Sequence, residues 1–316
     1  MRLTTRRLFV AAGILGMVIA TAPPGQAGTG YFNTYQEEGA TPNVGEHTGA
    51  QGFAVGADYN YSIKNRSRDD GSAVIYRVPN ATEVPQVMTN GANNSKSIAG
   101  LGHANDMTIA TIGGVNHFFI VTMSSTGYQV KKLSYSGNTY KEVGRFTVKE
   151  NGATKAVSGI NRVLVTSTKI DFFFKSGSTV YKGSLPATAN TGTINITKAF
   201  TLKTSGALVG GKPIDLTGFV SQGFFYHESK KVLYYPLTKA NVSVVLVYRN
   251  VTSTSTGVLA PSKDTSFRIT SAKYSKFEIE SLGINSKDGK LYFNTNRSTS
   301  TNGNLDGVQV FEGYVA

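Results

Sequence analysis

The stretch GHANDMTIATIGGVNHFFIVTM, residues 102–123, opens with a polar cluster, continues as an apolar strand, turns at a Gly-Gly pair and returns as an aromatic strand. This pattern predicts two antiparallel strands joined by a tight turn. The polar residues His103, Asn105 and Asp106 stand where the first strand begins. They either bind a ligand or satisfy one another at the start of a buried strand, and the rest of the chain bears on that choice.

The same arrangement recurs four more times along the chain. Each unit opens with a polar residue followed by Gly or an equivalent, then an apolar strand, a turn and an aromatic strand. The openers are 54, 53, 64 and 58 residues apart: Gln51, Asn105, Ser158, Gln222 and Glu280. This spacing leaves room for two further strands in each unit, and it therefore predicts five four-stranded sheets.

The composition fits an all-β chain, because Thr, Ser, Val, Tyr and Phe dominate between turn signals such as Asp-Gly and Ser-Gly. Five sheets arranged radially form a five-bladed β-propeller, which protects its edges by closing into a ring. The fifth unit lacks a strand after residues 307–314, so we expect the mature N-terminal strand, residues 30–35, to complete it. We assign residues 28–316 to this single propeller domain; two packed sheets are the alternative architecture.

The first 27 residues have the pattern of a cleaved export signal. A basic start precedes an apolar run from Leu8 to about Ala22, and the segment ends in the small-residue pattern Gly25-Gln26-Ala27. The sequence TRRLFV at residues 5–10 is similar to a twin-arginine export motif. We therefore expect a secreted protein with no stable membrane span in its mature chain, and ordinary secretion is the alternative route.

The mature chain is basic and contains no cysteine. The signal carries three of the 32 basic residues, so 29 remain against 19 acidic residues, a net charge of +10. An exported basic protein meets anionic cell-wall polymers and other glycans, and its charge favours those encounters. If charge drives attachment, binding should weaken as ionic strength rises. The basic residues form no stripe with interleaved aromatics, so we do not expect nucleic acid as a partner.

The openers are the candidate site residues. In a propeller the first strand of each blade lines the central channel, so residues at the strand starts should converge at one mouth. The expected ligand-binding residues are Gln51, His103, Asn105, Ser158, Gln222, Glu278 and Glu280. Asp106 and Glu280 are the candidate catalytic pair, because two carboxyl groups about 5 to 9.5 Å apart can cleave a glycosidic bond. Polar groups at a channel mouth can equally satisfy strand-end amides and hold ordered water.

Three short motifs resemble the helveticin J family of large secreted bacteriocins. They are Gly102-His103-Ala104, Ser221-Gln222-Gly223-Phe224 and Glu278-Ile279-Glu280-Ser281-Leu282-Gly283-Ile284. The resemblance covers most of the mature chain, and it implies a propeller and an antibacterial activity at the envelope of competing Gram-positive cells. The chain departs from the family after His103, where Asn-Asp stands in place of the more frequent Glu, so the target could differ.

We therefore expect a secreted bacteriocin-like protein acting at the cell envelope of competing bacteria. The alternatives are a lectin-like glycan-binding propeller and a glycan-cleaving enzyme. We expect no cofactor and no metal site, with a bound cation as a weak possibility at residues 302–307, which imitate the start of a Ca²⁺ loop. Gly313 stands where such a loop needs its bidentate Glu, so a turn is the better interpretation.

Overall fold

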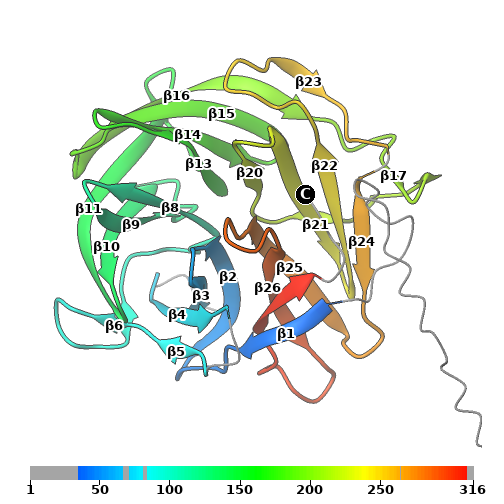
Figure 1. The fold of residues 1–316 in the computed structure, drawn as a ribbon, viewed down its shortest axis with the longest axis horizontal. Helices are drawn as coiled ribbons and strands as arrows, with labels where there is room; N and C mark the ends of the chain where they lie inside the picture. The colour runs from blue at the N-terminus through cyan, green and yellow to red at the C-terminus, as the bar shows by residue number, and fades with distance from the viewer. Residues whose placement is uncertain (1–34, 67–70, 81–83, 264, 312–316) are drawn as a thin grey trace, which may run out of the picture.

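The inner strands of five blades lie side by side around a common axis (Figure 1). The structure is a computed structural model, and it describes residues 35–66, 71–80, 84–263 and 265–311. Contacts between inner strands run around the ring, from β2 to β8, β13, β20, β25 and back to β2. The chain therefore folds as the five-bladed all-β propeller that the repeat spacing predicts. The predicted export signal, residues 1–27, lies outside the described residues.

Blades 1 and 2 follow the predicted order of consecutive antiparallel strands. Blade 1 consists of β2 (His47–Val55), β3 (Tyr59–Arg66) and β4 (Ala73–Pro79), with the short β5 (Gln86–Val87) and β7 (Ser97–Ile98) on its outer edge. Blade 2 consists of β8 (Asp106–Ile112), β9 (Val115–Val121), β10 (Val130–Ser136) and β11 (Thr139–Glu150). The short strands β6 (Thr89–Asn90) and β12 (Ala153–Thr154) add to β11.

Blade 3 is regular, whereas blade 4 has an interrupted inner strand. Blade 3 consists of β13 (Gly159–Val165), β14 (Lys169–Ser176), β15 (Thr179–Pro186) and β16 (Thr191–Leu202). In blade 4, β19 (Val220–Ser221) and β20 (Phe225–His227) both pair with β21 (Val232–Lys239), followed by β22 (Val242–Tyr248) and β24 (Phe267–Thr270). The short β17 (Leu208–Val209) and β18 (Lys212–Pro213) form a hairpin, and β23 (Gly257–Leu259) pairs with β16.

The N-terminal strand that the structure describes closes the ring in blade 5. This blade consists of β25 (Lys276–Ile284), β26 (Leu291–Ser298), β27 (Gly307–Phe311) and, as its outer strand, β1 (Tyr35–Ala40). β1 pairs antiparallel with β27, from Tyr35 opposite Phe311 to Ala40 opposite Gly307. The predicted closing strand thus begins at the last residue of the expected segment and continues beyond it; residues 30–34 and 312–314 lie outside the described residues.

The hydrophobic core is divided into five clusters, each between two neighbouring blades. Strand alternation explains the division, because successive side chains of a strand point to opposite faces of its sheet. On β14, Phe172 and Phe174 pack toward blade 2, and Phe173 packs toward blade 4. Aromatic strands such as this one therefore fill the space on both sides of a blade.

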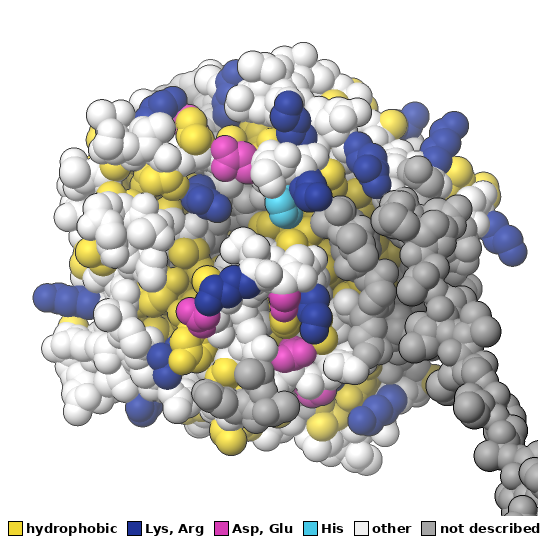
Figure 2. Space-filling view, in the orientation of Figure 1, with side chains coloured by type: hydrophobic (Ala, Val, Ile, Leu, Met, Phe, Trp, Pro, Cys, Tyr) yellow, Lys and Arg dark blue, Asp and Glu magenta, His cyan; other side chains and the backbone are white. Residues whose placement is uncertain are grey.

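Two features complete the description of the molecule. The outer strands β11 and β16 pair in parallel, from Arg145 opposite Thr191 to Glu150 opposite Ile196, so blades 2 and 3 share one continuous sheet. Figure 2 shows Lys and Arg side chains scattered over one face of the molecule among hydrophobic and uncharged atoms. Within the described ranges, the structure contains no helix of the length and apolarity needed to cross a bilayer.

Candidate functional site

The five inner strands approach one another closely at the residue that follows each polar opener. These residues are Gly52, Asp106, Gly159, Gly223 and Ser281. The Gly52 N–H donates to the Ala104 carbonyl at 2.9 Å, and the Gly223 N–H donates to the Glu280 carbonyl at 2.7 Å. A Cβ atom on Gly52 would lie 2.8 Å from the Ala104 carbonyl oxygen, and one on Gly223 would lie 2.9 Å from Asp106 Oδ1. Glycine is required at both positions because the neighbouring chain leaves no room for a side chain.

The space left at the axis is filled by the carboxylate of Asp106, which is 0% exposed. Its Oδ1 accepts hydrogen bonds from the Met107 N–H at 3.0 Å and from Ser281 Oγ at 2.9 Å. Its Oδ2 accepts from the N–H groups of Ile160 at 3.1 Å and Phe224 at 3.3 Å. The donors belong to blades 2, 5, 3 and 4, so this one side chain connects four of the five blades.

The environment of Asp106 has opposing effects on its charge. Burial raises the pKa of Asp106 to about 7, while its hydrogen-bond donors and the nearby Lys175 cation oppose that rise. Lys175 is also buried, and burial lowers the pKa of its ammonium group to about 8. Its Nζ donates to Ser158 Oγ at 3.1 Å. The axis therefore contains an acid and a base that are both held away from solvent.

Three of the openers use polar groups to connect neighbouring strands. Asn105 Nδ2 donates to the Ser158 carbonyl at 2.6 Å, which links blade 2 to blade 3. The Gln51 carbonyl accepts from Asn294 Nδ2 at 2.7 Å, which links blade 1 to blade 5. Asn105 and Gln51 are buried, and Ser158 is half-buried. These contacts satisfy the Asn105 amide and two backbone carbonyl groups, as the non-functional alternative predicts. The buried Gln51 Oε1 accepts no hydrogen bond from the described residues.

Gln222 and His103 are more accessible. Gln222 is half-buried, and its Nε2 donates to Thr238 Oγ1 at 3.4 Å. His103 is exposed, while its backbone is fixed: its N–H donates to the Thr122 carbonyl at 2.9 Å and its carbonyl accepts from Asn65 Nδ2 at 3.0 Å. His103 is therefore the opener-end side chain that solvent reaches most readily among the residues predicted from the sequence.

The two glutamates of β25 have different environments. Glu278 is half-buried and pairs with Lys276, with Nζ 2.8 Å from Oε2. Glu280 is 1% exposed, and burial, reinforced by the neighbouring Glu278 carboxylate, raises the pKa of Glu280 well above its ordinary value. Glu280 is therefore a buried acid that favours its protonated form.

The structure places the five openers on neighbouring inner strands but encloses both candidate catalytic carboxyl groups. Asp106 was expected at an accessible channel mouth; it points to the axis, but it is covered on all sides. Because Asp106 and Glu280 are both buried, a glycosidic bond has no access to the space between them in this conformation. The solvent-open carboxylate pair suggested by the sequence is thus not formed, and ligand binding by the other openers stays a prediction.

The segment considered as a cation loop has a structural role at Asp306. This buried carboxylate pairs with Lys64 at 3.1 Å and accepts from the N–H groups of Arg297 at 2.8 Å and Ala50 at 3.1 Å. Among the described residues, no group of three or more His, Cys, Asp or Glu side chains is placed to hold a metal ion.

Asp106 and the four residues at the corresponding positions form a layer across the axis. A solvent-accessible cavity, which we call the funnel, lies on the side of this layer toward the C-terminal ends of the inner strands. Its volume is about 420 Å³, and it is lined by residues of all five blades. In each inner strand the opener precedes the axial residue, whereas the funnel residues follow it. Representative lining residues, one from each blade in chain order, are Val55, Ile109, Arg162, His227 and Ile284.

The funnel combines an apolar wall with hydrogen-bonding groups at accessible positions. Phe225 is half-buried, and its ring meets that of His227 edge-on, with centroids 6.1 Å apart. Arg162 and Glu228 are exposed and provide charges of both signs. Thr108 Oγ1 accepts from the Arg162 N–H at 3.1 Å, which fixes β13 against β8. An aromatic surface beside charged and hydroxyl groups is typical of a site for a small polar ligand.

The funnel residues were not predicted from the sequence. They lie in the second half of each inner strand and in the turn after it, where the pattern indicates only an apolar strand. The sequence FFYHES, residues 224–229, is the one signal in these segments, because His and Glu follow the aromatic residues directly. His227-Glu228 is not followed by the second His of a zinc-binding motif, since Lys231 stands at that position.

No family model matches the chain, and no curated protein matches it by sequence. Several solved structures are similar in fold. The alignment with a thermostable family-43 glycoside hydrolase has a TM-score of 0.49 and 9% sequence identity, and it covers 83% of this chain and 88% of the hydrolase chain. The alignment with a family-43 β-xylosidase/α-arabinofuranosidase from a compost microbial metagenome has a TM-score of 0.48 and 9% identity, and it covers 87% of this chain and 94% of that chain. The alignment with an α-L-arabinanase of Penicillium chrysogenum has a TM-score of 0.43 and 10% identity, and it covers 88% of this chain and 97% of the arabinanase chain. These are similarities of fold alone.

Proposed function

We propose that this protein is an exported glycan-binding propeller that takes part of a bacterial cell-wall polysaccharide into the axial funnel. The observation that carries the proposal is the funnel itself, to which every blade contributes. Its volume of about 420 Å³ lies within the range of small-molecule sites. The half-buried ring of Phe225 offers a surface for the apolar face of a sugar, and the charged and hydroxyl groups around it can hydrogen-bond sugar hydroxyls.

Binding is a better proposal than cleavage because of how the carboxyl groups are placed. Glycoside hydrolysis ordinarily requires two carboxyl groups flanking the scissile bond. The described lining of the funnel contains one acidic residue, Glu228, while Asp106 and Glu280 are enclosed. The antibacterial activity implied by the resemblance to helveticin J remains a proposal, for which attachment to the target wall would be the first step.

The proposal is tested by incubating the purified protein with peptidoglycan, wall teichoic acid, xylan and arabinan, and with live Gram-positive indicator cells. We expect binding to at least one of these polymers without release of sugar reducing ends. Arg162→Ala should weaken binding by about tenfold, because it removes a charged donor from the funnel. The matched control is Arg249→Ala, which removes an exposed arginine outside the funnel and should bind as the wild type does.

Each readout separates one function from another. Release of reducing ends would contradict the proposal in favour of a hydrolase. Binding accompanied by loss of viable cells would add the antibacterial activity to the proposed function. Absence of binding to every polymer, with the protein folded as judged by its thermal transition, would overturn the proposal.

A further inference from the structure

The funnel adjoins two further cavities that lie over blades 3 and 4. Tyr226, Glu228 and Ser229 line both the funnel and an adjoining cavity of about 630 Å³. That cavity in turn shares Asp171 and Ser253 with a third cavity, of about 430 Å³. We call the second and third cavities together the blade 3/4 groove. Because each cavity shares lining residues with the next, the three lie in a row from the axis to the outer strand of blade 3.

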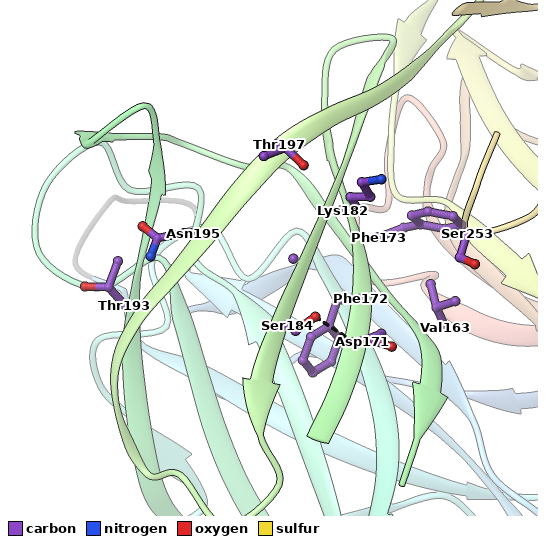
Figure 3. A pocket seen from close by; sticks show the side chains of 11 residues that line it. Val163, Asp171, Phe172, Phe173, Lys182, Ser184, Thr193, Asn195, Thr197 and Ser253 are labelled. Atoms are coloured by element: carbon purple, nitrogen blue, oxygen red, sulfur yellow. Dashed lines mark hydrogen bonds between the residues drawn. The ribbon is translucent and has the colours of Figure 1, made fainter. Parts of the chain in front are cut away.

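The outer part of the groove lies across the sheet of blade 3 (Figure 3). Thr193, Asn195 and Thr197 are spaced along β16, and Lys182 lies on the adjacent strand β15. All four side chains are exposed. Residues two apart on a strand point to the same face, so the three β16 side chains present a row of hydrogen-bonding groups along the groove.

The wall where the two cavities of the groove meet is polar and fixed. Asp171 accepts from Ser184 Oγ at 2.6 Å and pairs with Lys169 Nζ at 2.8 Å. Ser253, from the loop after β22, lies on the opposite side of the same cavity from the β16 row (Figure 3). Hydroxyl groups and a held carboxylate on facing walls can contact a chain that passes between them.

The charge of the groove argues for an uncharged ligand. Lys182 and Lys231 contribute two positive charges to its lining, and Asp171 and Glu228 contribute two negative charges. An anionic polymer would meet as many carboxylates as ammonium groups, whereas a neutral polyol can use both kinds as hydrogen-bond partners. The net charge of +13 of the whole sequence is therefore not concentrated in this groove.

We infer that the funnel and the blade 3/4 groove together bind one linear, uncharged polysaccharide, with a terminal part in the funnel and successive sugar units along the groove toward β16. The inference rests on the proposed function, since it assigns the rest of the polymer to a surface that adjoins the same site.

The experiment measures how affinity depends on ligand length. Oligosaccharides from the disaccharide to the octasaccharide, prepared from the polymer that binds in the first experiment, are titrated into the purified protein by calorimetry. Affinity should rise with each added unit until the groove is filled and then remain constant. Since the groove carries balanced charge, this gain should persist at high ionic strength.

Two variants test where the added units bind. Lys182→Ala/Asn195→Ala should leave the affinity for the disaccharide unchanged and weaken the longest oligosaccharides by about tenfold, because two hydrogen-bonding side chains are lost. Ser253→Trp should reduce the same gain by obstructing the groove. The matched controls, Lys141→Ala and Thr188→Trp, change exposed residues outside the three cavities and should bind every length as the wild type does.

The possible failures are distinguishable. If no polymer binds, the proposed function fails and the groove inference fails with it. If a polymer binds but affinity is independent of length, or the groove variants keep the full gain, the funnel proposal stands and the groove inference is overturned. A bound polymer that is anionic, with an affinity lost at high salt, would also overturn the groove inference.

Discussion

The carboxylate of Asp106 fills the axis of the ring, where the sequence predicts an open channel. Three blades have glycine at the corresponding position and a fourth has serine, so the five inner strands can approach until a single carboxylate occupies the axis. Its oxygens accept four hydrogen bonds from four blades. A buried carboxylate is costly unless it is satisfied in this way. Its surroundings therefore indicate a role in holding the ring together.

Replacing Asp106 with Asn should destabilise the protein by about 1–3 kcal/mol at neutral pH, because an amide cannot accept all four hydrogen bonds. The variant should also change the pH dependence. Since burial raises the pKa of Asp106 to about 7, the folded protein keeps a proton that the unfolded chain releases near pH 4. The wild type should therefore lose stability relative to Asp106→Asn as pH rises from about 4 to 7.

Urea unfolding of both proteins across this pH range measures the difference directly. A wild type that gains stability relative to the variant as pH rises would show that the carboxylate is already ionised in the folded protein at low pH. In that case its four donors and Lys175, not its burial, would dominate its pKa.

At the scale of the element, β1 closes the ring through charge as well as backbone pairing. Arg297 on β26 donates from Nη1 and Nη2 to the two carboxylate oxygens of Glu37, both at 2.7 Å, and Gln309 Nε2 donates to Glu37 at 3.1 Å. The Arg297 side chain is 4% exposed, whereas that of Glu37 is 41% exposed. The closing strand thus provides the counter-ion of a buried guanidinium group.

Glu37→Ala should lower the free energy of unfolding by about 1–3 kcal/mol, because it leaves the buried charge of Arg297 without its partner. Glu46→Ala is the matched control: its pair with Arg66 is exposed, so its loss should cost less than about 1 kcal/mol. Chemical denaturation of the three proteins provides the comparison. Equal losses in the two variants would mean that the Arg297 pair does not stabilise the closure of the ring.

Much of the element order could be predicted from the chain. The five openers correspond to five blades because each marks an inner strand, and the missing strand after β27 correctly indicated closure by the N-terminal segment. The parallel pairing of β11 with β16 could not be predicted, because it depends on how far two outer strands extend beyond their own blades. Nor does the local pattern show that the inner strand of blade 4 is divided into β19 and β20.

At the scale of the whole molecule, the sequence pattern does not show which end of the axis is accessible to solvent. A strand pattern indicates which residues share a face, but each inner strand borders both ends of the channel. Asp106 and Glu280 became buried only because five strands converge on them, which is a property of the assembled ring. The funnel residues Arg162 and His227 lie on the other side of that layer, in segments whose pattern does not show that they face the axis.

The two ends of the axis can be compared with one pair of substitutions, His227→Ala in the funnel and His103→Ala at the opener end. Both remove an imidazole ring from a position that solvent reaches. The measurement is the affinity of each folded variant for the polysaccharide that the wild type binds. The account predicts that His227→Ala weakens binding by about tenfold and that His103→Ala binds as the wild type does. Loss of binding in His103→Ala, with binding retained in His227→Ala, would contradict it and place the functional site at the strand starts.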